Sequence, residues 1–143
     1  MTATRLPQDI YAAALRDRES DDPLTKQQAC EKGWLAVIEA VDSFLATKGR
    51  FIKEGEPDAR VQRVRALSDL AVQDPSLWKL SEKVSVVAEN LHGACFYGGL
   101  DSPANDRYLK ETVRDILEMT GHDLDPPSRR ATTGSKKAIR RGT

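Results

Sequence analysis

Apolar residues recur at alternating steps of three and four along residues 77–91, and this repeat strongly restricts the folds open to the chain. The positions are Leu77, Leu80, Val84, Val87 and Leu91. Steps that average close to the helical repeat of about 3.6 residues place side chains on one face of an α-helix. The spacing continues to Ala94 and Cys95. The sequence therefore predicts a helix from residue 76 to about residue 97 with a single apolar seam.

Four other segments carry helical periodicity, and short turn-forming stretches separate them. We expect helices over residues 8–18, 23–48, 59–73 and about 102–120. Asp22 before Pro23 is a typical N-cap and first helical residue, and Gly49 is a typical C-terminal stop. The β-like string at residues 84–87 lies inside a helical repeat. The predicted fold class is all-α.

Short connections between long helices favour antiparallel neighbours. The sequence thus predicts an up-and-down bundle of four to five antiparallel helices in one domain, residues 1–125. We expect the helices at 23–48, 76–97 and 102–120 to carry the core. The helix at 59–73 packs beside them with Arg63 on or beside its polar face, and the helix at 8–18 closes the bundle or lies across its end.

The net charge of zero hides an asymmetry between the body of the chain and its end. Residues 1–125 hold 16 basic and 22 acidic residues, whereas residues 126–143 hold six basic residues and no acidic one. The segment 126–143 is also rich in Pro, Ser, Thr and Gly, so we expect a disordered basic tail. Such a tail either binds nucleic acid or an acidic partner through its charge, or is a solubilising extension.

Several classes of protein are disfavoured by composition. No apolar run approaches the roughly 20 residues that a membrane span needs, and the first residues lack the apolar stretch of a secretory signal. Cys30 and Cys95 stand alone in helical patterns, without the paired spacing of a zinc or redox motif. We interpret both as reduced core thiols of a cytoplasmic protein, and we expect no metal and no cofactor.

The candidate functional residues lie on the two longest predicted helices. We expect His92, Tyr97, Glu31 and Lys32 to line a groove between the helices at 23–48 and 76–97. A partly buried His92 could act as a general base, a nucleotide contact or a metal ligand. The alternative is a structural histidine that is bonded to a carboxylate or a carbonyl. We identify no catalytic residue, so the sequence leans against an enzyme.

Gly33 lies inside a predicted helix, where glycine costs about 1 kcal/mol relative to alanine. A close approach of another helix, against Gly93 or Ala94, would explain it. A ligand pocket is the alternative explanation.

The string LHGACFYGG at residues 91–99 resembles a Leu-His-x-x-x-aromatic-Tyr-x-Gly pattern of the HEPN-like superfamily of small helical bundles, closest to its paREP-type branches. The string ACEKGWLAVIEAV at residues 29–41 is similar to the A-x-x-K-x-W/Y-x-A-x-x-x-A pattern of the same family. The resemblance covers about residues 8–120 and leaves out the tail.

This resemblance implies a bundle of four or five helices that often forms homodimers. Many members are metal-independent ribonucleases of toxin–antitoxin or defence systems, and others partner a small nucleotidyltransferase. The ribonucleases carry an Arg-x(4–6)-His motif, which is absent here: no arginine has that spacing before His92, and seven residues separate Arg114 from His122. We therefore expect a non-catalytic, dimeric binding module, with RNA or a nucleotide as a candidate ligand. The alternatives are a divergent ribonuclease and a nucleic-acid-associated protein that uses its basic tail.

Overall fold

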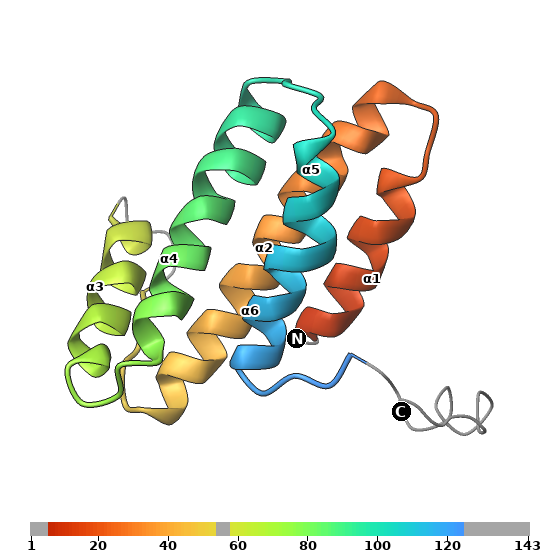
Figure 1. Cartoon of the computed structure of the whole chain (residues 1–143). Coiled ribbons are helices and arrows are strands. Elements are labelled where there is room, and N and C mark those ends of the chain that lie inside the picture. Colours follow the sequence, from red (N-terminus) through yellow and green to blue (C-terminus); the bar gives the residue numbers. More distant parts are fainter. Residues whose placement is uncertain (1–5, 54–57, 125–143) are drawn as a thin grey trace, which may run out of the picture.

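The computed structural model describes residues 6–53 and 58–124, which form a bundle of helices (Figure 1). The elements are α1 (Pro7–Arg18), α2 (Pro23–Thr47), α3 (Ala59–Ala71), α4 (Leu77–Val87), η1 (Ala88–Tyr97), α5 (Ala104–Arg107), η2 (Tyr108–Val113) and α6 (Arg114–Met119). Because η1 continues α4 and because α5, η2 and α6 follow one another directly, the chain makes five helical rods. No strand occurs in the described ranges, and the predicted all-α bundle is confirmed.

The helix ends follow from local sequence. The carboxylate of Asp22 accepts a hydrogen bond from the backbone N–H of Thr25 at 3.0 Å, as expected of an N-cap. Gly49 ends α2 with a φ of 76°, a backbone conformation that glycine adopts without steric cost. Both predicted boundaries are confirmed.

Three rods surround the core, as expected, and two flank it. The fully buried residues come mainly from α2, the α4–η1 rod and the α5–α6 rod; the largest are Val37, Val41, Leu45, Leu67, Leu80, Val84, Val87, Leu91, Leu109, Val113, Ile116 and Leu117. In Figure 1, α3 lies beside α4 and α1 runs along α2. The first helix therefore closes the bundle along its side and does not cross its end.

Two stretches of the bundle, η1 and η2, are π-helical, with wider turns than the predicted α-helix. Buried residues recur at steps of four across and beside these stretches, at Val87, Leu91 and Cys95 in one rod and at Leu109, Val113 and Leu117 in the other. Each rod therefore keeps one side facing the core through its π-helical stretch.

One arginine expected near the polar face is buried instead. The guanidinium of Arg63 donates two hydrogen bonds to the carboxylate of Asp42 on α2, at 2.7 and 2.9 Å. A bidentate pair of this kind satisfies both charges away from water. The spacing of apolar residues within one helix could not predict this ion pair, because Asp42 lies on another helix.

In the described part of the chain, no helix is both long and apolar enough to cross a membrane. The basic tail expected at residues 126–143 lies outside the described residues, so its predicted disorder stays a prediction.

Candidate binding site between α2 and η1

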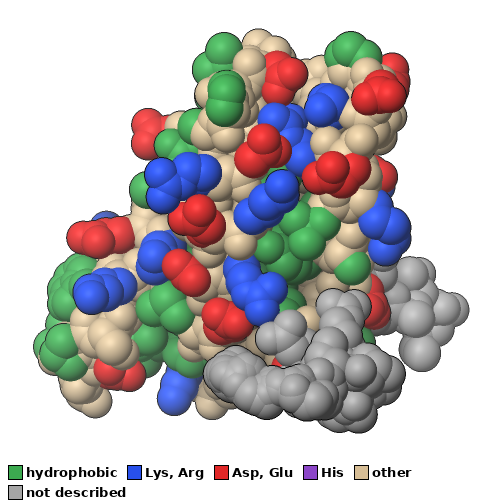
Figure 2. Space-filling view, turned by 45° about the vertical axis from the view of Figure 1, so that its right-hand side comes forward, with side chains coloured by type: hydrophobic (Ala, Val, Ile, Leu, Met, Phe, Trp, Pro, Cys, Tyr) green, Lys and Arg blue, Asp and Glu red, His purple; other side chains and the backbone are tan. Residues whose placement is uncertain are grey.

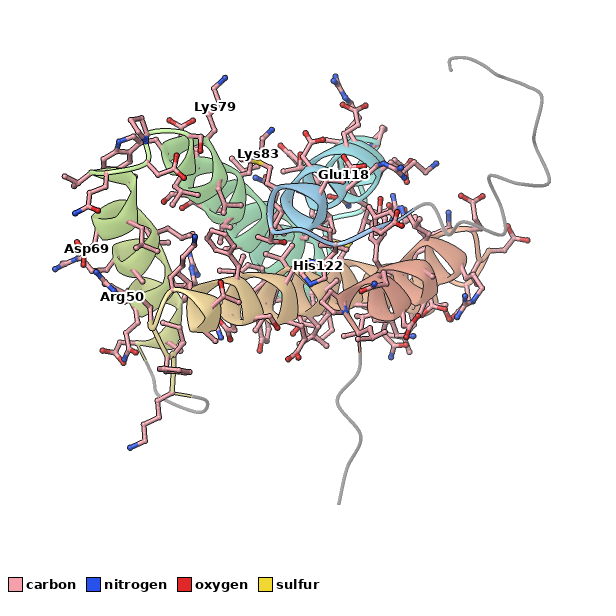
Figure 3. All side chains as sticks on the ribbon, turned by 90° about the horizontal axis from the view of Figure 1, so that it is seen from below. Arg50, Asp69, Lys79, Lys83, Glu118 and His122 are labelled. Atoms are coloured by element: carbon pink, nitrogen blue, oxygen red, sulfur yellow. A yellow bond between two sulfur atoms is a disulfide. The ribbon has the colours of Figure 1, made fainter. Side chains whose placement is uncertain are left out.

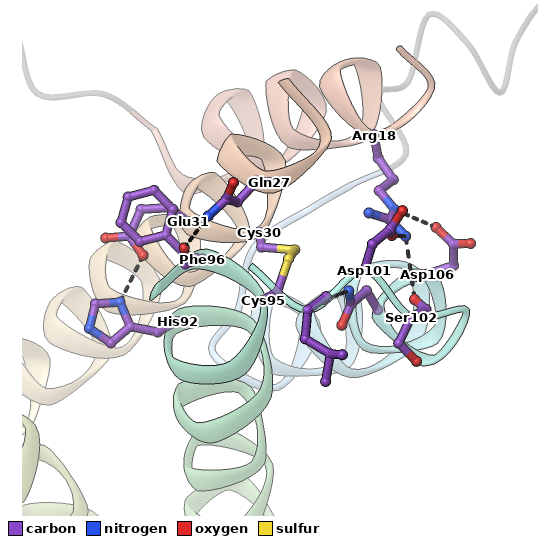
Figure 4. Close-up of a disulfide and its surroundings, with 12 residues drawn as sticks. Arg18, Gln27, Cys30, Glu31, His92, Cys95, Phe96, Asp101, Ser102 and Asp106 are labelled. Carbon is purple, nitrogen blue, oxygen red and sulfur yellow. Dashed lines mark hydrogen bonds and ion pairs between the residues drawn. A yellow bond between two sulfur atoms is a disulfide. The ribbon is translucent and has the colours of Figure 1, made fainter. Parts of the chain in front are cut away.

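Glu31 on α2 and His92 on η1 form a hydrogen-bonded pair. The Oε1 atom of Glu31 lies 2.7 Å from Nδ1 of His92, and the two side chains are 22% and 25% exposed. Figure 4 shows the imidazole turned so that its second nitrogen points away from the carboxylate. An ionised carboxylate accepts the hydrogen bond from Nδ1, and in a neutral imidazole of this tautomer Nε2 is the acceptor.

Aromatic rings surround this imidazole. The centroid of the tilted Trp34 ring lies 5.5 Å from that of the imidazole, and the Tyr97 ring meets the imidazole edge-on at 4.9 Å. Phe96 in turn contacts Tyr97 edge-on, with the centroids 5.0 Å apart. Trp34 is buried, whereas Tyr97 is 72% exposed. The cluster therefore runs from the core to a surface aromatic, and His92 lies in the middle of it.

Cys30 and Cys95 form a disulfide directly beside this pair (Figure 4). Both residues are buried, as predicted, but the expectation of reduced thiols is wrong for this structure. The two residues are 65 positions apart in the chain, and the packing of η1 on α2 brings their Cα atoms to 6.2 Å. That separation is within the normal range for a disulfide. Their isolation in sequence therefore gave no sign of their pairing in space.

A further bond holds the same two elements together. The side-chain amide of Gln27 on α2 donates to the backbone carbonyl of Phe96 at 2.5 Å. The disulfide, this hydrogen bond from Gln27 and the Glu31–His92 pair thus lie one after another along the contact between α2 and η1. We call the solvent-accessible part of this contact the α2–η1 face; it consists of Glu31, His92, Phe96 and Tyr97.

Lys32 is not part of this face. Its ammonium group pairs with the carboxylate of Asp17 on α1, on another side of α2. The structure thus brings together three of the four predicted site residues, Glu31, His92 and Tyr97, and separates the fourth.

The other histidine lies away from the site. Figure 3 places His122 at the end of α6, where its Nδ1 is 3.1 Å from the Thr120 hydroxyl. Within the described residues, no three His, Cys, Asp or Glu side chains are grouped so that they could hold a metal ion. The chemistry of the α2–η1 face is accordingly that of a hydrogen-bonding imidazole among aromatic rings.

Gly33 marks a close approach of helices. A Cβ atom at this position would lie 2.5 Å from Cδ2 of Leu109 on η2 and 3.4 Å from Cδ1 of Leu91 on η1. Close packing was predicted and is confirmed, but its partners are these two leucines and not Gly93 or Ala94. The space at Gly33 is filled, so it is no ligand pocket.

Comparison of the chain with models of protein families, with curated proteins and with solved structures finds no match. Only the residues of the site therefore point to what the protein does.

Proposed function

We propose that this protein is a non-catalytic interaction module that dimerises, or docks a protein partner, through the α2–η1 face. The observation that carries the proposal is the exposed ring of Tyr97, which rests against a His92 that Glu31 holds in place. Tyrosine is among the residues that most often carry the binding energy of protein interfaces. A ring held by neighbours loses little conformational entropy when it is buried by a partner.

Nearby apolar residues support a protein partner. The N-terminal end of α2 meets the C-terminal end of η1. Exposed leucines lie at both ends, Leu24 in α2 and Leu100 three residues after η1. Aromatic and aliphatic side chains that are surrounded by polar groups are typical of an interface core.

The charge of the site disfavours nucleic acid. Glu31 brings a carboxylate into the α2–η1 face, and a carboxylate repels phosphate. On the side of the molecule shown in Figure 2, basic and acidic side chains are interspersed and no basic stripe is visible. A second copy of this chain is therefore our first candidate partner, and RNA or a nucleotide is the weaker one.

The HEPN-like affiliation, the homodimer and the cytoplasmic location belong to this proposal. An all-helical bundle is compatible with that superfamily, whose members include partners of small nucleotidyltransferases. If the second copy fails as a partner, a nucleotidyltransferase-like protein is the next one to test.

Sedimentation equilibrium of the wild type and of two matched variants tests the proposal. Tyr97→Ala removes the exposed ring of the α2–η1 face, and Phe51→Ala removes a ring that is 78% exposed outside it. We expect a wild-type dimer that Tyr97→Ala weakens at least roughly tenfold, the effect of losing about 1.4 kcal/mol. Phe51→Ala should leave it unchanged. Equal effects of both variants, or a wild-type monomer at millimolar concentration, would contradict dimerisation through this face.

A divergent ribonuclease is the second candidate, and the partly exposed imidazole of His92 is the observation that favours it. Incubation of labelled RNA with the wild type and with His92→Ala decides between the two functions. Cleavage by the wild type alone would support the ribonuclease and would overturn the non-catalytic module. We expect no cleavage by either protein.

A further inference from the structure

The disulfide adjoins the α2–η1 face on both elements. Cys30 directly precedes Glu31 in α2, and Cys95 directly precedes Phe96 in η1, three positions after His92. No other covalent bond joins the two elements in the described part of the chain. The position of η1 against α2, and with it the geometry of Glu31 and His92, therefore depends on the state of these two sulfur atoms.

A small cavity opens onto one of the two cysteines. It has a volume of about 90 Å³, and its lining includes Cys95, Arg18, Lys26 and Asp101, but not Cys30. Figure 4 shows Arg18 turned toward Asp101 and Asp106, with which it forms ion pairs. After the hydrogen bond and charge of Arg18, the charge of Lys26 also helps to lower the pKa of Asp106. The two cations therefore face two carboxylates, and what the cavity offers is an approach to Cys95 that it does not offer to Cys30.

We propose that the Cys30–Cys95 disulfide is a reducible clamp on the α2–η1 face, opened at Cys95 by a low-molecular-weight thiol whose sulfur-bearing end enters this cavity. The reagent is identified by its chemistry: its CH₂–SH end is small enough for the cavity, and its sulfur attacks the disulfide. Disulfides of cytosolic proteins are usually transient and redox-sensing. A reducible clamp thus reconciles the disulfide of the structure with the proposed cytoplasmic location.

The exchange proceeds in two balanced steps. The thiolate attacks Sγ of Cys95, the bond between Cys95 and Cys30 breaks, and its electron pair leaves with Cys30, which takes up a proton. Cys95 is then joined to the small thiol in a mixed disulfide. A second thiolate attacks the sulfur of the attached small thiol and releases Cys95. Two small thiols are oxidised to one disulfide, and the protein disulfide is reduced to two thiols.

Opening the disulfide leaves η1 held to α2 by non-covalent contacts alone, among them the Gln27 bond to Phe96 and the Glu31–His92 pair. We expect these hydrogen bonds to break more often once the disulfide is reduced, so that His92 and Tyr97 lose their fixed positions. The α2–η1 face is then fully formed only in the oxidised protein. This consequence for binding rests on the proposed function, whereas the site of thiol attack does not.

Two single variants test the site of attack. Cys30→Ser leaves Cys95 as a thiol beside the cavity, and Cys95→Ser leaves the buried Cys30. After treatment with glutathione disulfide, we expect mass spectrometry to find the glutathione adduct on Cys30→Ser at least tenfold faster than on Cys95→Ser. Far-ultraviolet circular dichroism confirms that both variants remain helical. Equal rates, or faster modification of Cys30, would overturn the assignment of Cys95.

The charge of the thiol provides a second test. Reduction of the oxidised protein is followed with glutathione, which is anionic, and with cysteamine, which is cationic. Each variant's rate is divided by the wild-type rate with the same thiol, so that the thiols' own reactivities cancel. Lys26→Glu should slow glutathione roughly fivefold and speed cysteamine. Lys79→Glu, which changes an exposed lysine outside the cavity, should alter neither rate. Equal effects of the two substitutions would overturn the role of the cavity.

Hydrogen exchange of the backbone amides of residues 92–98 tests the clamp itself. Reduction with dithiothreitol should raise exchange there at least tenfold more than in α3, and the double variant Cys30→Ser/Cys95→Ser should show the raised exchange without reductant. Unchanged exchange on reduction would overturn the clamp. If reduction raises exchange but the protein never dimerises, the proposed function is wrong and the clamp still holds.

Discussion

Glu31 Oε1 and His92 Nδ1, which belong to residues 61 positions apart in the chain, lie 2.7 Å apart across the contact between α2 and η1. The pair is the polar centre of an otherwise aromatic cluster. It fixes which way the imidazole faces and supports the ring of Tyr97. Both the local packing and the proposed binding surface therefore depend on this one hydrogen bond.

Substitution of Glu31 should disturb His92 more than it disturbs the fold. We expect Glu31→Ala to lower the free energy of unfolding by about 1–2 kcal/mol, because a partly buried imidazole loses its acceptor. The ¹⁵N shifts of His92 should also change, since its proton is no longer held on Nδ1. Urea denaturation and NMR measure the two effects. The control is Glu89→Ala, which removes an exposed carboxylate from η1. An equal loss of stability in Glu89→Ala would speak against a specific role of the pair.

Loss of the disulfide should lower stability by more than any single hydrogen bond in the site. The cross-link spans 65 positions, and in the chain-entropy account closing a loop of that length is worth about 4 kcal/mol. We expect Cys30→Ser/Cys95→Ser to unfold at a correspondingly lower urea concentration. The oxidised wild type, denatured without reductant, should yield no free thiol on titration. Two free thiols in protein purified under oxidising conditions would contradict the pairing.

Gly33 and Gly93 should respond oppositely to alanine. A Cβ on Gly33 would overlap Leu109, which is fully buried and has little room to move. Overpacking of about 1–3 kcal/mol then outweighs the gain of about 1 kcal/mol in helix propensity. At Gly93 the nearest atom would be the Ala88 carbonyl oxygen at an ordinary 3.5 Å. Gly33→Ala should therefore destabilise and Gly93→Ala should not, as measured by thermal unfolding. A stabilising Gly33→Ala would show that Leu109 can move aside.

The loss of folding stability at low pH should depend on Asp106. The hydrogen bond from the Arg18 guanidinium holds the pKa of Asp106 below its ordinary value. Because the folded-state pKa is depressed, this contribution is present above the unfolded pKa of about 3.9 and is lost as pH falls through the folded value. We expect Asp106→Asn to be less stable than the wild type at pH 7. Its free energy of unfolding should also fall less than that of the wild type between pH 7 and pH 3. The control is Asp21→Asn, at an exposed position. If Asp106→Asn loses as much stability at low pH as the wild type does, the role of Asp106 is contradicted.

The five rods could be predicted from sequence because their signals are local. Apolar steps of three and four, Asp22 before Pro23 and the stop at Gly49 each act within one helix. Close packing at Gly33 was also predictable, since glycine destabilises a helix interior and is expected there where another helix comes close. Its partners were not predictable, because they depend on how two other rods slide along α2.

The pairings in the site could be predicted only in part. His92 was expected to bind a carboxylate or a carbonyl as one of two alternatives, but the choice of Glu31 depends on the register between α2 and η1. The same register decides that Cys30 meets Cys95, which periodicity alone does not reveal. Lys32 follows Glu31 in sequence, and the helical twist of about 100° per residue turns it toward α1.

A concentration series of ¹H–¹⁵N NMR spectra of the oxidised protein tests the central claim most directly, since it reports association and its location together. We predict concentration-dependent shifts that gather at Glu31, His92 and Tyr97 and leave Phe51 and the rest of the surface unchanged. Spectra that do not change up to millimolar concentration, or shifts that gather away from the α2–η1 face, would contradict the account.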